Sequence, residues 1–223
     1  MNDQNVSARE SVRYWNQIFF STSIGRKFVM GLTGLGVAGF LMFHLFGNAF
    51  LLEGEASFNS YSKFLHGIPL LPIIELGLFA FFLLHVVVGI LVTFQNLFAR
   101  PVNYEVRATG GRANLASRTM IYTGGALLIF ICYHLWTLIA GRLPDESPWT
   151  RVQSILANPI SVAIYSVGFI ALGTHLFHGF SSMMVTFGAR QSRHDEWVDL
   201  VCRAGALILA LGYAGLAFYF FLK

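Results

Sequence analysis

The chain has 223 residues, of which 55% are hydrophobic and only 12% are charged, with a formal net charge of +4. Soluble domains usually carry about 25% charged residues, so this composition excludes an ordinary soluble globular protein. The basic excess lies mostly in the connections between apolar segments, which is a topology signal. Nothing in the sequence argues for nucleic acid as a partner.

Residues 1–27 precede the first apolar stretch and are polar, but Val6, Val12, Trp15 and Phe19 recur at nearly helical spacing. That spacing suits a short amphipathic helix lying on the membrane interface, and a disordered tail is the alternative. The segment is too polar for a signal peptide, so the first apolar stretch is expected to be retained as a span.

Five apolar stretches follow, and each is long enough to cross a bilayer, which takes about 20 apolar residues per helix. They are residues 28–52, 70–98, 119–140, 159–187 and 201–222. Membrane-spanning strands would instead give alternating segments of about ten residues. The sequence therefore predicts an all-α membrane protein, a five-transmembrane-helix bundle in which residues 1–223 form a single membrane domain with no obvious internal repeat.

The orientation follows from the distribution of basic residues. The N-terminal segment and the second and fourth connections hold 11 of the 15 Lys and Arg residues. Cytoplasmic segments carry such an excess. We therefore expect a multi-pass protein of the cytoplasmic (inner) membrane, with its N-terminus in the cytoplasm and its C-terminus outside.

Four of the five spans carry histidine: His44, His85 and His134 in the first three, and both His175 and His178 in the fourth. An imidazole inside hydrocarbon is costly and is by default a sign of function. The alternative is a helical anchor or small transporter in which these side chains only hydrogen-bond neighbouring helices.

The predicted topology gives each histidine a depth. Counted from the outer ends of their spans at 1.5 Å per residue, His44 and His134 lie about 12–14 Å deep, and His85 and His175 about 24–26 Å deep. Two depth-matched pairs on alternate helices suit two haem irons, each with two axial imidazoles. We predict an outer haem between His44 and His134 and an inner haem between His85 and His175, with His178 as the alternate ligand in the fourth span.

Four motifs make the chain recognisable. They are Ser23-Ile24-Gly25-Arg26-Lys27 entering the first span, His44-Leu45-Phe46-Gly47-Asn48, Tyr133-His134-Leu135-Trp136 and His175-Leu176-Phe177-His178-Gly179. In their order and histidine count they resemble, over nearly the whole chain, the single-chain di-haem cytochrome b558 anchors of succinate dehydrogenase and fumarate reductase (succinate:quinone oxidoreductase).

The resemblance implies two haem b groups, with the first histidine of the fourth-span motif, His175, as the ligand. It also implies a flavoprotein subunit and an iron–sulfur subunit on the cytoplasmic side, with a higher oligomer of the complex left open. Electrons would pass between the iron–sulfur subunit and a membrane quinone, expected to be of the menaquinone type, in the tricarboxylic acid cycle or in fumarate reduction. The chain itself would have no catalytic residue, because the dicarboxylate chemistry would take place on a partner subunit.

A quinone headgroup needs polar partners near a haem edge. Tyr61, His66 and Glu75, on the outer side, are the candidates. Trp15, Ser23 and Arg26 could supply such partners on the inner side, and ordinary interface anchoring is the alternative for each residue. The rival function within electron transfer is a di-haem cytochrome b subunit of a hydrogenase or formate dehydrogenase, and the rival outside it is a haem-free anchor or transporter.

Overall fold

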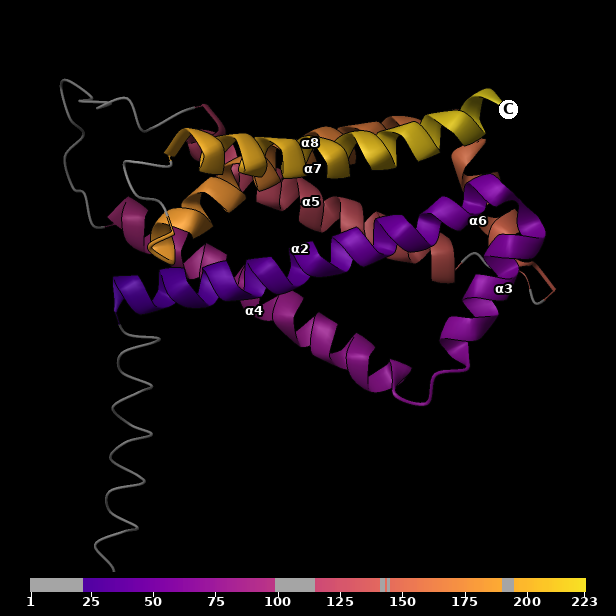
Figure 1. Cartoon of the computed structure of the whole chain (residues 1–223), viewed down its shortest axis with the longest axis horizontal. Helices are drawn as coiled ribbons and strands as arrows, with labels where there is room; N and C mark the ends of the chain where they lie inside the picture. The colour runs from indigo at the N-terminus through magenta and orange to yellow at the C-terminus, as the bar shows by residue number, and fades with distance from the viewer. Residues whose placement is uncertain (1–21, 99–114, 141–142, 144, 190–194) are drawn as a thin grey trace, which may run out of the picture.

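A computed structural model describes residues 22–98, 115–140, 143, 145–189 and 195–223 (Figure 1). The described residues form helices α2 (Ser23–Glu53), α3 (Glu55–His66), α4 (Leu71–Phe98), α5 (Leu115–Ile139), α6 (Pro148–Leu156), α7 (Pro159–Thr186) and α8 (Asp195–Leu222). By length and composition, five of them suit a membrane crossing: α2, α4, α5, α7 and α8. The predicted all-α fold with five spanning helices is confirmed, whereas the interfacial helix predicted before it falls mostly on residues outside the described part.

Local chemistry sets where the first span begins and ends. Thr22 caps α2 by accepting a hydrogen bond from the Gly25 amide at 3.0 Å, which satisfies one of the free donors of the first turn. Gly54 ends the helix at a φ of 108°, a left-handed conformation that favours glycine, and the chain then turns directly into α3. The helix has 31 residues and is therefore about 46 Å long, more than a bilayer core needs.

The long helices alternate in direction, so their connections collect at the two ends of the bundle. Figure 1 shows α3 and α6 together at one end, which we call the α3–α6 end, with the start of α2 at the other. The two short helices join through polar contacts: the Ser147 hydroxyl donates to Glu55 at 2.9 Å, and the Trp149 amide donates to Asn59 at 3.1 Å. The sequence indicated only connecting loops here, because short amphipathic segments give a weak periodic signal.

The most deeply packed helix is α7, which contacts α2, α5, α6 and α8. Its buried residues Tyr165, Phe169, Leu172 and Leu176 form one cluster with Ala206, Leu209, Tyr213, Ala217 and Phe220 of α8. In contrast, α4 packs chiefly against α2, and α4 and α5 carry many exposed apolar side chains. Apolar exposure of this kind suits helices that face lipid.

Candidate functional site

The structure brings the four predicted span histidines together as two pairs. The rings of His44 on α2 and His134 on α5 have centroids 6.0 Å apart and planes at 85°. The rings of His85 on α4 and His175 on α7 have centroids 6.2 Å apart and planes at 75°. All four rings are partly buried. These pairs are the ones that depth alone predicted, and the first lies nearer to the α3–α6 end.

The spacing within each pair suits one metal ion between two opposed imidazoles. A ring nitrogen lies about 2.0–2.1 Å from a bound metal and about 1.2 Å from its own ring centre, which puts two opposed centroids about 6.4 Å apart. The observed 6.0 and 6.2 Å are close to that value. Among the described residues, no group of three or more His, Cys, Asp and Glu side chains converges on such a point.

Each ring of the His85–His175 pair rests on a threonine–glycine pair of the neighbouring helix. Nδ1 of His85 lies 3.4 Å from the Thr33 hydroxyl and 3.2 Å from the Met30 carbonyl. Nδ1 of His175 lies 3.2 Å from the Thr123 hydroxyl. The following residues are Gly34 and Gly124, and a Cβ built there would be 3.1 Å and 3.4 Å from Cε1 of the respective ring.

The His44–His134 pair lies in aromatic surroundings. Nδ1 of His134 is 2.9 Å from the Tyr165 hydroxyl, and the Tyr165 ring is buried on α7. The ring of His44 stacks on Phe40, with centroids 5.2 Å apart and planes at 19°. The Tyr213 ring lies 6.0 Å from His44, and its hydroxyl donates to the Leu41 carbonyl of the same helix as His44.

A 90-residue spacing relates the two halves of this arrangement. It separates His44 from His134, His85 from His175, and Thr33 from Thr123. Each threonine is also 52 residues before the histidine that it contacts. The helix pair α2–α4 and the pair α5–α7 therefore repeat the placement of these residues, a repeat that was not obvious in the sequence. The threonines, the glycines and Tyr165 were not predicted, although the shared spacing was a signal that could have found the threonines and glycines.

The remaining predicted site residues are not brought together by the described contacts. His178 is partly buried on α7, and the ring facing His85 is that of His175. Tyr61 packs on α2, with its ring stacked 4.7 Å from Phe50. His66 is exposed, with Nδ1 2.7 Å from the Ser62 carbonyl of its own helix, and Glu75 is exposed on α4.

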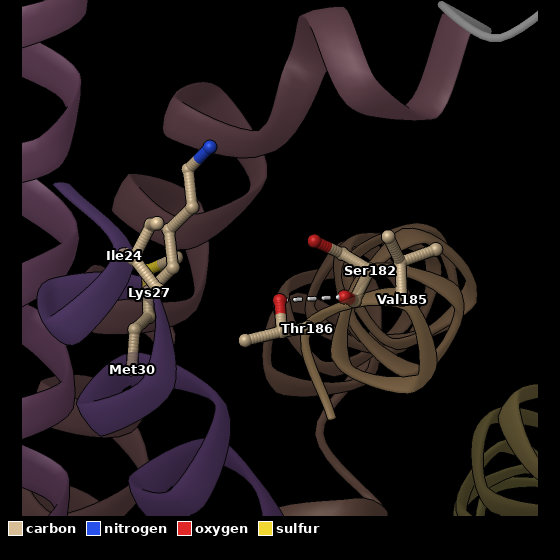
Figure 2. Close-up of a pocket in the computed structure, with 6 residues that line it drawn as sticks. All are labelled: Ile24, Lys27, Met30, Ser182, Val185 and Thr186. Atoms are coloured by element: carbon tan, nitrogen blue, oxygen red, sulfur yellow. Dashed lines mark hydrogen bonds between the residues drawn. The ribbon is translucent and has the colours of Figure 1, made fainter. Parts of the chain in front are cut away.

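A cleft of about 280 Å³ lies between the start of α2 and the end of α7. Figure 2 shows its lining residues facing one another from the two helices: Ile24, Lys27 and Met30 from α2, and Ser182, Val185 and Thr186 from α7. The Thr186 hydroxyl is used within its own helix, where it donates to the Ser182 carbonyl at 2.9 Å. Met30 links the cleft to the His85–His175 pair, because its carbonyl is the one beside His85.

Comparison with known proteins agrees with this architecture. A family model described as the succinate dehydrogenase/fumarate reductase transmembrane subunit matches residues 100–215. The succinate dehydrogenase cytochrome b558 subunit of Bacillus subtilis (strain 168) is 27% identical over 198 residues, which cover 84% of this chain and 90% of that relative. No solved structure matches the chain. This multi-pass membrane protein therefore belongs to the family of succinate dehydrogenase/fumarate reductase transmembrane subunits, as a membrane anchor of such a complex.

Proposed function

We propose that this anchor is a di-haem cytochrome b that carries electrons between an iron–sulfur subunit and membrane quinone. The observation that carries the proposal is the pair of facing imidazoles at each of two levels, with ring centroids 6.0 and 6.2 Å apart. The relative's name, a cytochrome b558 subunit, supports haem b as the group held there.

In this proposal, His44 and His134 hold one haem iron, and His85 and His175 hold the other. A haem held by two imidazoles in this way would supply one-electron transfer and would leave no position on its iron for oxygen or substrate. The neighbouring helices hold the four imidazole rings partly buried. Along α2, Gly34 beside His85 is ten residues from His44, so the two levels are about 15 Å apart.

The family supports the assignment of partners and sidedness. A flavoprotein subunit and an iron–sulfur subunit would dock at the end where α2 begins, which the basic residues put in the cytoplasm of an inner-membrane protein. Quinone, of the menaquinone type, would bind at the α3–α6 end. Among the three candidates, Tyr61 has a described contact close to a histidine pair, because its hydroxyl lies against Gly47, three residues after His44.

The first test is the reduced-minus-oxidised spectrum of the purified complex, with haem counted per chain. We expect two b-type haems, both reduced when succinate is added. Two haems that succinate does not reduce would assign the chain to another dehydrogenase. A chain without haem would overturn the proposal.

Single alanine substitutions then identify the ligand in the fourth span. We expect His175→Ala to lose one haem of the two and His178→Ala to keep both, because His175 is the ring that faces His85. The reverse result would make His178 the ligand. Folding of both variants is checked by co-purification with the partner subunits.

A further inference from the structure

The hydroxyls beside His85 and His175 each have a backbone carbonyl of their own helix to accept their hydrogen. The Thr33 hydroxyl donates within its own helix, to the Val29 carbonyl at 2.8 Å or the Met30 carbonyl at 3.1 Å. The Thr123 hydroxyl donates to the Met120 carbonyl at 3.1 Å. A hydroxyl has one hydrogen and two lone pairs, so each oxygen is able to accept the Nδ1 proton of its histidine while its own hydrogen bonds the backbone.

For His85, a second contact fixes the position of the ring proton. The Met30 carbonyl, 3.2 Å from Nδ1, can only accept a hydrogen bond, so Nδ1 must carry the proton. Nε2 is then left with a free lone pair, which is the state that a metal ligand needs. The Thr33 oxygen shares the same Nδ1 proton, and Thr33 itself is only 3% exposed.

The same arrangement occurs again at His175, in the second repeat. Thr123 takes the place of Thr33, and Gly124 lets the ring lie close to the helix as Gly34 does. Thr93 on α4 has the same internal hydrogen bond, to the Gly89 carbonyl at 2.8 Å, but no described contact with a histidine. Internal bonding of a threonine therefore recurs among the described residues, and at the two equivalent positions Thr33 and Thr123 it is combined with a contact to a histidine ring.

We propose that Thr33 and Thr123 are positioning residues for the His85–His175 site, each accepting the Nδ1 proton and directing Nε2 at the bound iron. This inference rests on the proposed haem function. A hydrogen bond from Nδ1, the ring nitrogen that does not face the iron, fixes the ring tautomer and orientation and makes the imidazole a more basic ligand. A more basic ligand stabilises the ferric state, so the two threonines lower the midpoint potential of this haem.

The two histidines of this pair differ in how far the hydrogen bonding of Nδ1 depends on the threonine hydroxyl. His85 retains the Met30 carbonyl when the Thr33 hydroxyl is removed, whereas Thr123 is the hydrogen-bond partner described for Nδ1 of His175. The effect of removing the hydroxyl should therefore be larger at Thr123.

The experiment is a redox titration of both haems in the whole complex, with Thr33→Val, Thr123→Val and the serine counterparts. We expect both valine variants to raise the midpoint potential of the same haem, Thr123→Val by more, and serine to restore the wild-type value. The control Thr93→Val should move neither potential. Tyr165→Phe should move only the other haem, because its hydroxyl contacts His134.

Three outcomes separate the inference from the function on which it rests. Valine variants that leave both potentials unchanged would overturn the positioning role while the haem function stands. The positioning role would also be overturned if the potentials of both haems shift together, or if serine fails to restore the potential, because either result indicates altered packing. A wild-type chain without haem would overturn the proposed function and this inference with it.

Discussion

The four paired histidines differ in what holds their rings. Described hydrogen bonds reach Nδ1 of His85, His134 and His175, from a carbonyl or a hydroxyl on a neighbouring helix. The ring of His44 is instead held by stacking on Phe40 and by the nearby Tyr213 ring. Aromatic contacts orient a ring but leave its nitrogens unaffected, so described hydrogen bonds reach both rings of the His85–His175 pair and one ring of the His44–His134 pair.

The ring planes within each pair lead to a spectroscopic prediction. At 85° and 75° the planes are nearly perpendicular, so in the proposed haem sites the two imidazoles would donate into different iron orbitals and leave them close in energy. We expect both oxidised haems to give strongly anisotropic low-spin EPR signals, each with one large g value. An ordinary rhombic spectrum from either haem would mean that its two rings are parallel when haem is bound.

At the scale of helices, close contact between α5 and α7 depends on Gly168. A Cβ built at this position would lie 2.7 Å from ring carbons of Phe130, and that ring packs against His134, Tyr165 and Phe169. An aromatic ring enclosed on several sides has little freedom to move away. The small residue therefore sets how near the two helices that carry His134 and His175 approach each other.

In Gly168→Ala, we expect overpacking to lower the free energy of unfolding by about 1–3 kcal/mol. The higher helix propensity of alanine should offset roughly 1 kcal/mol of that loss. Gly215→Ala on α8 is the matched control, because a Cβ there has no neighbour within 4 Å. Thermal unfolding in detergent measures both variants. Equal midpoints for the two variants would show that the Phe130 ring moves aside freely.

At the scale of the whole molecule, the predicted orientation rests on charge alone. The excess of Lys and Arg in the N-terminal segment and in the second and fourth connections predicts that the start of α2 lies in the cytoplasm. With five spans, the C-terminus would then lie outside. The same orientation would put the His85–His175 pair nearer to the cytoplasmic partners than the His44–His134 pair.

A reporter fused after Lys223 tests this orientation. We expect an enzyme that is active only outside the cytoplasm to be active in the fusion, and a cytoplasm-dependent reporter to be inactive at the same position. The opposite pattern would invert the bundle and move the docking site of the partner subunits to the α3–α6 end.

The sequence by itself determined the five spanning helices, because hydrocarbon demands about 20 apolar residues in a row and that demand is visible without any packing information. It also determined which histidines pair, because a helix advances by a fixed rise per residue and depth can be counted along the chain. Counting the depth of a residue needs only the ends of its span. The two histidine pairs predicted in this way are the ones whose ring centroids lie 6.0 and 6.2 Å apart.

The tertiary structure alone decided what surrounds each ring. Which face of α2 meets α4, and of α5 meets α7, depends on rotation of the helices about their axes, and apolar sequences give almost no amphipathic signal to set that rotation. The contacts of Thr33, Thr123 and Tyr165 with the Nδ1 atoms were therefore visible only in the structure, although the 90-residue spacing singles out the two threonines in the sequence. For the same reason the stacking of Tyr61 on Phe50 followed from how α3 packs against α2, and was not visible in the order of residues.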